Sequence, residues 1–298
     1  MAPRISIHKK FSIPGIEEYS SLIVRAALKE DLGAGDITTA ALVARNRAGV
    51  ARLMAKEDFV LAGLFVAEKA FHALDPKAVF KAHLRDGNVV KKGEAIATIE
   101  GRLASLLSAE RVALNFLQRM SGIATLTARF VGRVRGTGAR ILDTRKTTPC
   151  LRILERYAVK AGGGYNHRFG LFDSVLIKDN HIRAAGGVDK AVKKAGKRLG
   201  QGVAIEVEVA NIRETIEAVS SGADIIMLDN FKIDDIKKAV KVIGKSAFIE
   251  VSGGVTLEQV RRIADAGVDF ISVGALTHSA KAVDISMEIT GNEAGAGR

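Results

Sequence analysis

Residues 204–230 read AIEVEVANIRETIEAVSSGADIIMLDN, and residues 248–275 repeat the pattern as FIEVSGGVTLEQVRRIADAGVDFISVGA, beginning 44 residues later. Each copy passes from a short apolar run to a stretch with helical spacing and then to a second apolar run. A repeated strand–helix–strand unit gives parallel strands joined by right-handed crossovers. The repeat therefore predicts an α/β fold with a parallel sheet.

The same alternation of strands and helices begins at about residue 140. Strands are expected over residues 141–142, 174–177, 203–209, 224–228, 247–251 and 270–273, each followed by a helical stretch. Residues 158–161 are a candidate for a seventh strand, after a helix that begins near Pro149 with Thr148 as its N-cap. Six or seven strands fit an incomplete (β/α) barrel better than a doubly wound sheet, which stays open as the alternative.

The chain before residue 115 has a less regular pattern. Helical spacing is expected over residues 16–32 and 64–74, strands over 47–61 and 79–101, and helix again over 103–134. The last of these stretches is expected to form two helices that break near Ser121 and Gly122, because glycine weakens a helix interior. The change of rhythm places a domain boundary near residue 115.

The chain carries a large excess of basic residues. Its 45 lysines and arginines outnumber 33 acidic residues, which gives a net charge of +12. Such an excess favours either a nucleic-acid surface or a field that attracts anionic substrates. Aromatic residues make up only 5% of the chain, tryptophan is absent, and the longest basic runs are pairs. We therefore expect no nucleic-acid partner, because such surfaces combine basic runs with aromatic side chains.

Cysteine content and hydropathy predict the compartment. Cys150 is the single cysteine, so no internal disulfide can form and a reducing compartment such as the cytoplasm is expected. No apolar run approaches the roughly 20 residues of a membrane span. The first residues, MAPRISIHKKFSIP, do not contain the apolar core of a secretory signal. No membrane association is therefore expected.

Five groups that can carry positive charge follow the predicted strands or lie on a glycine-rich loop. They are Arg145, Lys146, His167, Arg168 and Lys178. Ligands of α/β folds bind at the carboxyl ends of the strands, so these groups are expected to meet at one site. Arginine can hold a planar carboxylate with two hydrogen bonds, and lysine adds a point charge. The cluster predicts a polyanionic small molecule; Lys178 alone could instead form a Schiff base, as in barrel aldolases.

Two segments of small residues at the last strand ends favour a bound phosphate. Ser252-Gly253-Gly254 follows the fifth clear strand, and Gly274-Ala275-Leu276 follows the sixth. Their backbone N–H groups are not blocked by large side chains, and the corresponding loops of (β/α) barrels commonly hold a phosphate. Either segment could also be an ordinary tight turn, but the pair on the last two strands favours the phosphate.

Glu208 and Asp229 are expected beside this phosphate, at the ends of adjacent strands. Two carboxylates can act as an acid–base pair or can hold Mg²⁺, which prefers oxygen ligands. Near a phosphate, Mg²⁺ is the simpler interpretation. The alternative is that each acid only forms an ion pair with the neighbouring cations.

Long motifs around these residues resemble the quinolinate phosphoribosyltransferase family, the decarboxylating enzymes of de novo NAD synthesis. The matching segments are Glu30-Asp31-Leu32-Gly33, Asp36-Ile37-Thr38-Thr39, Glu110-Arg111 with Asn115, Asp143-Thr144-Arg145-Lys146-Thr147-Thr148-Pro149, Gly162-Gly163-Gly164, Asn166-His167-Arg168, Leu176-Ile177-Lys178-Asp179-Asn180-His181, Glu206-Val207-Glu208, Leu228-Asp229-Asn230, Ser252-Gly253-Gly254 and Val273-Gly274-Ala275-Leu276-Thr277-His278. The resemblance spans nearly the whole chain.

The resemblance implies both a domain arrangement and an assembly. It implies an N-terminal α/β sandwich of residues 1–114, joined by a C-terminal helix over 279–298, and an open α/β barrel over 115–278. It also implies a homodimer or a larger assembly, in which Arg111 reaches into the active site of the neighbouring subunit.

The reaction that the resemblance implies joins quinolinate and phosphoribosyl pyrophosphate to give nicotinate mononucleotide, pyrophosphate and CO₂, with Mg²⁺ as cofactor. The catalytic residues that it implies are Lys146, Lys178, Glu208 and Asp229, the two acids holding Mg²⁺ directly or indirectly. The substrate-binding residues that it implies are Arg111, Thr144, Arg145, Lys146, His167, Arg168, Lys178, Glu208, Asp229, Ser252, Gly253, Gly254, Gly274, Ala275 and Leu276. No organic cofactor is needed, because the alkylated pyridine ring accepts the electrons left by CO₂.

Three other functions can be told apart by experiment. A related phosphoribosyltransferase that acts on another acid, such as the molybdenum-associated relatives, would not need so many cations for a dicarboxylate. A nucleic-acid-binding protein would bind duplexes in a strongly salt-dependent way and would not consume phosphoribosyl pyrophosphate. A Schiff-base aldolase would be trapped at Lys178 by borohydride.

Overall fold

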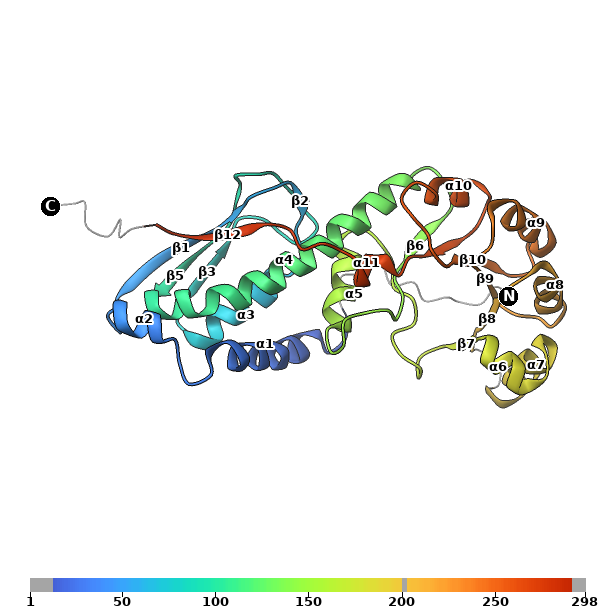
Figure 1. Ribbon diagram of the computed structural model, residues 1–298, viewed down its shortest axis with the longest axis horizontal. Coiled ribbons are helices and arrows are strands. Elements are labelled where there is room, and N and C mark those ends of the chain that lie inside the picture. The colour runs from blue at the N-terminus through green and yellow to red at the C-terminus, as the bar shows by residue number, and fades with distance from the viewer. Residues whose placement is uncertain (1–12, 200–202, 291–298) are drawn as a thin grey trace. The chain divides into compact units, whose positions relative to one another are not determined.

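The computed structural model describes residues 13–199 and 203–290, which fall into two compact units (Figure 1). Within the described residues, the barrel unit comprises residues 127–147 and 164–279, and the N-terminal unit comprises 13–126, 148–163 and 280–290. The division thus lies at 126/127 rather than at the expected 114/115, and residues 148–163 belong with the N-terminal unit.

The barrel unit is built on one parallel sheet of six strands. They are β6 (Arg140–Leu142), β7 (Val175–Ile177), β8 (Ile205–Val209), β9 (Ile225–Asp229), β10 (Phe248–Ser252) and β11 (Phe270–Ser272). Their order in the sheet is β6-β11-β10-β9-β8-β7, so the first strand of the series pairs with the last. The first and second strands are the two edges, which is the arrangement of an open barrel. The expected fold is confirmed.

Helices follow the strands of the barrel unit as the repeat predicts. They are α6 (Asp179–Ala185), α7 (Val188–Leu199), α8 (Ile212–Ser220), α9 (Ile233–Ile243), α10 (Val260–Asp265) and α11 (Ala275–His278). Figure 1 shows α7, α8, α9 and α10 on the outer side of the strands. Strand residues such as Val207, Ile226 and Ile271 are fully buried, because both faces of a parallel sheet are covered.

The N-terminal unit contains an antiparallel sheet of order β12-β1-β5-β3. The strands are β1 (Ala48–Ala55), β3 (Val79–Ala82), β5 (Ala95–Arg102) and β12 (Ile285–Thr290), and the short strands β2 (Phe59–Val60) and β4 (Val89–Val90) pair separately. The helices are α1 (Ile16–Leu32), α2 (Ile37–Leu42), α3 (Leu64–Leu74), α5 (Arg152–Ala161) and the first part of α4 (Leu103–Arg133). Burial alternates along β1, so one face of the sheet supplies the core.

The expectation of a C-terminal helix is wrong over residues 285–290. These residues form β12, which pairs antiparallel with β1 from Ile285 opposite Ala55 to Thr290 opposite Val50. β-Branched residues at 285, 289 and 290 suit this extended conformation. Residues 279–284 of the expected helix are not helical either, and residues 291–298 lie outside the described residues.

The expected break near Ser121 and Gly122 is also wrong, because α4 is one helix of 31 residues. Gly122 has another role: a Cβ at this position would collide with the main-chain carbonyl of Lys281. Glycine therefore allows the segment before β12 to pass close against α4, at the cost of helix propensity.

The expected strand over residues 158–161 is wrong as well, since these residues form the last turn of α5. The helix begins at Arg152 rather than at Pro149, and Leu151 rather than Thr148 is its N-cap. The Thr148 hydroxyl instead donates to the buried carboxylate of Glu155 at 2.8 Å, and the guanidinium of Arg119 pairs with the same carboxylate at 2.7 Å. These contacts join α4 and α5 within the N-terminal unit.

Candidate active site

The candidate site lies at the carboxyl ends of the barrel strands. Ser252 is level with Asp229 in the register of β10 and β9, and Val209, which follows Glu208, is level with Leu228 in β8 and β9. The fold therefore brings the predicted acids and the predicted phosphate segment together at the carboxyl ends of the strands, as expected for this topology.

Lys178 and Glu208 form an ion pair at the carboxyl ends of the strands. Lys178 follows β7 and is the N-cap residue of α6, and its Nζ donates to Oε2 of Glu208 at 2.6 Å. The Lys178 side chain is 44% exposed, whereas that of Glu208 is 16% exposed. The ion pair that the sequence left as an alternative is therefore present. Magnesium binding by Glu208 stays a prediction.

Asp143, at the end of β6, holds the segment that carries His167 and Arg168. Its carboxylate is fully buried and accepts hydrogen bonds from the main-chain N–H of His167 at 2.8 Å and from the side chain of Asn166. The main chain of Tyr165 pairs with Leu142 in a parallel bridge. The loop thus runs beside β6, so that His167 and Arg168 reach the barrel that also carries Arg145.

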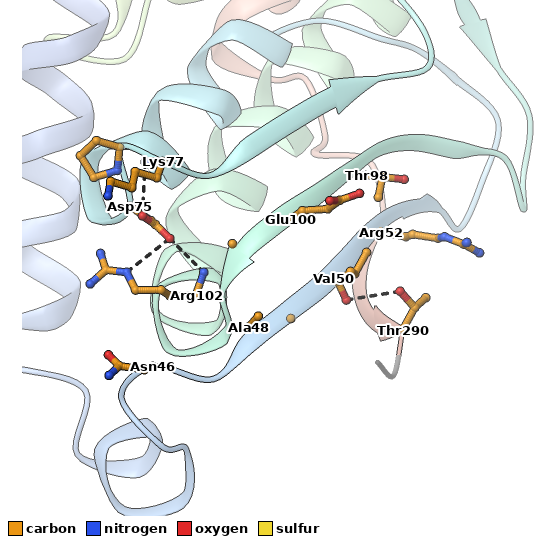
Figure 2. Close-up of a pocket in the computed structure, with 13 residues that line it drawn as sticks. Asn46, Ala48, Val50, Arg52, Asp75, Lys77, Thr98, Glu100, Arg102 and Thr290 are labelled. Carbon is orange, nitrogen blue, oxygen red and sulfur yellow. Dashed lines mark hydrogen bonds and ion pairs between the residues drawn. The ribbon is translucent and has the colours of Figure 1, made fainter. Parts of the chain in front are cut away.

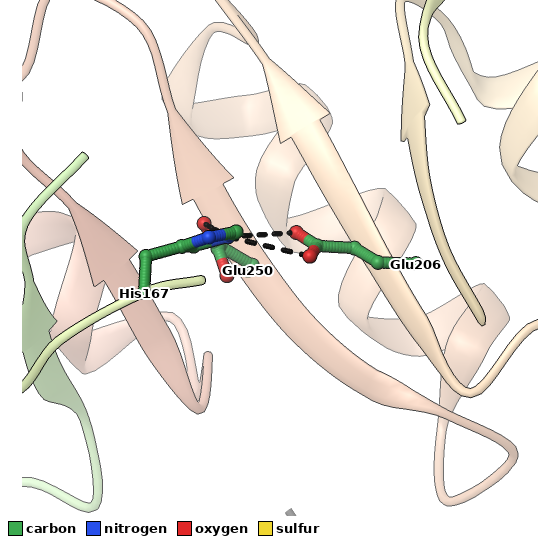
Figure 3. A group of neighbouring side chains, drawn as sticks. All are labelled: His167, Glu206 and Glu250. Atoms are coloured by element: carbon green, nitrogen blue, oxygen red, sulfur yellow. Dashed lines mark hydrogen bonds and ion pairs between the residues drawn. The ribbon is translucent and has the colours of Figure 1, made fainter. Parts of the chain in front are cut away.

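His167 contacts two buried glutamates that were not predicted as site residues. Its Nε2 lies 3.3 Å from both carboxylate oxygens of Glu206, on β8, and 3.5 Å from Oε1 of Glu250, on β10 (Figure 3). Glu250 also accepts a hydrogen bond from the hydroxyl of Ser272 at 2.5 Å. The three side chains are at most 10% exposed. The repeat carried a signal for this pair, because the two glutamates occupy the same place in the two IEV segments.

Burial and charge act against each other in this cluster. Burial, with the nearby Glu250 carboxylate, raises the pKa of Glu206 to about 7. Burial alone would lower the pKa of His167, but the two carboxylates together raise it well above its ordinary value. The donor atoms of His167, Glu206 and Glu250 lie within 4.8 Å of one another, so these residues could also hold a metal ion. In the structure, the imidazole of His167 contacts both carboxylates directly.

Arg145 and Arg168 lie close enough to affect each other. Burial and then the positive charge of Arg145 lower the pKa of Arg168. The guanidinium of Arg168 donates to the main-chain carbonyl of Ser174 at 3.1 Å, which fixes its direction. Two neighbouring guanidinium groups repel each other, so an anion bound between them is stabilised.

The two predicted phosphate segments contain glycines that other residues approach closely, and phosphate binding by them stays a prediction. Gly253 and Gly254 have φ of 94° and 58°, and a Cβ at Gly253 would collide with Asn230. At Gly274, a Cβ would lie 3.2 Å from Cδ of Lys146, so the lysine side chain passes over this glycine. The Thr277 hydroxyl donates to the carbonyl of Lys146 at 2.7 Å, and this bond holds the segment after β11 against the segment after β6.

Thr144, Leu276 and Arg111 are three further residues that were predicted to bind substrate. Thr144 accepts a hydrogen bond from the N–H of Lys146 at 3.1 Å, which shapes the turn after β6. Leu276 is fully buried, so contact of this residue with a ligand stays a prediction. Arg111 is an exposed residue of α4 in the N-terminal unit. Its reach into another subunit stays a prediction.

A separate cavity lies in the N-terminal unit and contains none of the predicted site residues. It has a volume of about 940 Å³ and is lined mainly by β1, β5 and the turn after α3 (Figure 2). Asp75 and Arg102 form an ion pair at 3.3 Å in its wall. Of the helices in the described ranges, none is long and apolar enough to cross a membrane.

Comparison with known proteins identifies the family. The model of the quinolinate phosphoribosyl transferase N-terminal domain matches residues 36–121, and that of the C-terminal domain matches residues 123–288. The probable nicotinate-nucleotide pyrophosphorylase (carboxylating) of Bacillus subtilis is 46% identical over 261 residues, which are 88% of this chain and 90% of that protein. A mitochondrial quinolinate phosphoribosyltransferase (decarboxylating) of Nicotiana tabacum is 44% identical over 286 residues, 90% of this chain and 81% of that protein.

Solved structures agree with this assignment. The nicotinate-nucleotide pyrophosphorylase of Francisella tularensis superposes with a TM-score of 0.89 at 41% identity, covering 94% of this chain and 98% of that one. NadC of Streptococcus pyogenes gives a TM-score of 0.90 at 41% identity, covering 94% and 99%. The chain belongs to the quinolinate phosphoribosyltransferase family.

Proposed function

We propose that this chain converts quinolinate and phosphoribosyl pyrophosphate to nicotinate mononucleotide, pyrophosphate and CO₂, a step of NAD biosynthesis. Family membership over nearly the whole chain supports the reaction. The observation that carries the substrate assignment is the pair of hydrogen bonds from Asn166 and His167 to Asp143, which hold the segment of Arg168 against the segment of Arg145. A ligand with two adjacent carboxylates suits two guanidinium groups, because each can accept paired hydrogen bonds.

The proposed quinolinate site uses the arginines for recognition and the lysines for charge. Arg145 and Arg168 bind the carboxylates, and Thr144 shapes the turn that carries Arg145. Lys146, whose side chain passes over Gly274, lies between the dicarboxylate and the phosphates. Lys178 serves the same purpose from the other side of the site and is directed by Glu208. A nicotinate ring, with one carboxylate fewer, would leave one arginine without its anion.

The proposed phosphoribosyl site uses backbone groups and acids. Residues 252–254 and 274–276 hold the 5′-phosphate through N–H groups. Glu208 and Asp229 suit Mg²⁺, because carboxylate oxygens on neighbouring strands are the hard donors that this ion prefers. When bound, Mg²⁺ would neutralise negative charge on the pyrophosphate.

In the proposed reaction, the ring nitrogen of quinolinate forms a bond to C1 of the ribose as the bond to pyrophosphate breaks. Positive charge develops on the sugar, and the carboxylates of Glu208 and Asp229 would stabilise it. The alkylated ring nitrogen is cationic, so it stabilises the carbanion that remains when the adjacent carboxylate leaves as CO₂. A proton then takes the place of CO₂ on the ring, which gives nicotinate mononucleotide.

The proposed assembly is a homodimer or a larger oligomer in which Arg111 of one subunit completes the site of another. The exposure of Arg111 on α4 is compatible with this role. Cytoplasmic location likewise stays a prediction, supported by the single, unpaired Cys150. We propose no nucleic-acid partner, since the cations described above gather around the small-molecule site.

The experiment that tests the function offers the purified chain phosphoribosyl pyrophosphate and Mg²⁺ with either quinolinate or nicotinate. Nicotinate mononucleotide, identified by mass spectrometry, is expected from quinolinate only. Equal use of nicotinate would contradict the dicarboxylate site, and a related phosphoribosyltransferase acting on another acid would then be favoured. Turnover that remains after borohydride treatment would further exclude a Schiff base at Lys178.

A further inference from the structure

We propose that Glu206 and Glu250 are positioning residues for quinolinate binding: they hold the imidazole of His167, which fixes the main chain of Arg168. The inference rests on the proposed role of Arg168 in binding quinolinate. Neither glutamate belongs to the set of substrate-binding or catalytic residues expected from the sequence, and both lie inside the barrel on alternate strands of the sheet.

The contact on the inner side of the imidazole involves Nε2. Both carboxylate oxygens of Glu206 lie 3.3 Å from this atom, and Oε1 of Glu250 lies 3.5 Å from it (Figure 3). The hydroxyl of Ser272, on β11, donates to the same oxygen of Glu250 and fixes that carboxylate in turn. Because all of these groups are buried, a change in any of them leaves a polar atom without a water molecule to replace its partner.

The contact on the other side of the imidazole involves Nδ1. The main-chain N–H of Arg168 donates to Nδ1 of His167 at 2.8 Å. In the neutral ring that this contact requires, Nδ1 carries no proton and Nε2 is the N–H that faces the glutamates. The ring therefore connects the barrel interior to the backbone of Arg168, and rotation of the ring would release that backbone.

The charge of Glu206 has a second consequence for Arg168. The nearby guanidinium of Arg145 disfavours the charged form of Arg168, and the carboxylate of Glu206 favours it. The negative charge of Glu206 thus offsets part of the repulsion between Arg168 and Arg145 before the substrate arrives. Contacts with His167 and Arg168 offset the cost of a carboxylate inside the barrel, where an unpaired one is destabilising.

The test compares Glu206→Gln and Glu250→Gln with the unchanged protein in steady-state kinetics. Both variants are expected to raise the KM for quinolinate about ten- to a hundredfold, since misplacing one charged group by about 1 Å costs about that much. The KM for phosphoribosyl pyrophosphate, and kcat at saturating quinolinate, should change less than about threefold by the same reasoning, because the phosphate segments are untouched. Glu217→Gln is the matched control: this glutamate lies on α8, its carboxylate accepts the N–H of Asp189 on α7 at 3.0 Å, and its quinolinate KM should not change.

A double-mutant cycle separates positioning from a general loss of structure. If the glutamates act through His167, Glu206→Gln should add nothing to the quinolinate KM of a His167→Gln variant. Additive effects, or an unchanged quinolinate KM in folded single variants, would overturn the inference.

If the glutamate variants do not fold, Ser272→Ala is measured in their place. A smaller rise in the quinolinate KM is then expected, and an unchanged quinolinate KM would overturn the inference. Arg168→Lys tests the underlying assignment of Arg168 to quinolinate binding. If this variant leaves the quinolinate KM unchanged, the proposed substrate site is wrong. If Arg168→Lys raises the quinolinate KM but the glutamate variants do not, only the positioning role is rejected.

Discussion

The ammonium group of Lys178 donates to the carboxylate of Glu208 at 2.6 Å, so the last residue before α6 and the fourth residue of β8 form one charged unit. This pair lies at the carboxyl ends of the strands, where the family resemblance expects catalytic groups. Within the pair each charge sets the direction of the other, so the removal of one partner changes the field that the remaining partner exerts on a bound substrate.

We therefore expect Lys178→Ala and Glu208→Gln each to lower kcat about a hundredfold, the loss that follows removal of one group that stabilises developing charge. The measurement is the initial rate at saturating concentrations of both substrates. Lys193→Ala is the control, because Lys193 forms an exposed ion pair with Asp189 on α7 at 2.8 Å and should leave kcat unchanged. Full activity of both site variants would remove this pair from the mechanism.

Gly122 offers a test of packing in the N-terminal unit. Alanine is the better helix former, so a glycine inside α4 should ordinarily be improved by it. Here Gly122→Ala is expected to lower the free energy of unfolding by about 1–3 kcal/mol, because the added methyl group collides with the carbonyl of Lys281. Gly132→Ala in the same helix, where a Cβ would meet nothing within 4 Å, should be neutral or stabilising. Thermal or urea unfolding distinguishes the two, and equal behaviour would contradict the close approach.

The pair of Asp75 and Arg102 predicts how stability depends on pH. The main-chain N–H of Arg102, assisted by its guanidinium, lowers the pKa of Asp75 below its ordinary value. Because the folded pKa is the lower one, the stabilisation is present above the ordinary pKa and is lost as the pH falls through the folded pKa. Asp75→Asn should therefore cost about 1–2 kcal/mol at neutral pH, and the difference should vanish in acid.

Asp58→Asn is the matched control for this effect. Asp58 likewise pairs with a basic residue, Lys91, at 2.8 Å. The Asp58 side chain is 56% exposed, however, so water replaces the lost contact. Urea unfolding of both variants across a pH series is the measurement. A deficit for Asp75→Asn that persists below the folded pKa would show that packing rather than charge is responsible.

The proposed shared site predicts that two inactive variants can restore each other. Arg111→Ala and Arg145→Ala should each be inactive alone, because each lacks one group that binds the dicarboxylate. If Arg111 acts across a subunit interface, a mixed dimer contains one site that retains both arginines, so mixing should restore up to about a quarter of the activity for random exchange in a dimer. Mixtures in which subunit exchange is confirmed by mass spectrometry but activity stays absent would count against a shared site.

The sequence predicted the barrel better than the N-terminal unit, and the reason is physical. Strands β8 to β11 and their helices are specified locally, by an apolar run and then a helical period, so the repeat was enough to find them. Strand β12 forms through pairing with β1, which lies far away in the sequence, and no local sequence pattern predicts such a partner. Gly122 was read as a helix break for the same reason, since the segment that requires it is remote.

The candidate site shows the same limit in another form. The cations after the strands were found because charge at a strand end is conspicuous in a sequence. Glu206 lies inside an apolar strand and was passed over, although Glu250 stands at the same place in the second copy of the repeat. Their meeting at His167 depends on the loop that Asp143 holds, and only the folded structure reveals it.

The central claim is that the site transfers the phosphoribosyl group to a dicarboxylate and then releases one carboxylate. The measurement that tests it most directly follows CO₂ and pyrophosphate together, with quinolinate labelled at the carboxyl group beside the ring nitrogen. One labelled CO₂ is expected for each pyrophosphate, with no release when either phosphoribosyl pyrophosphate or Mg²⁺ is left out. Pyrophosphate without CO₂, or CO₂ without phosphoribosyl pyrophosphate, would contradict the proposed reaction.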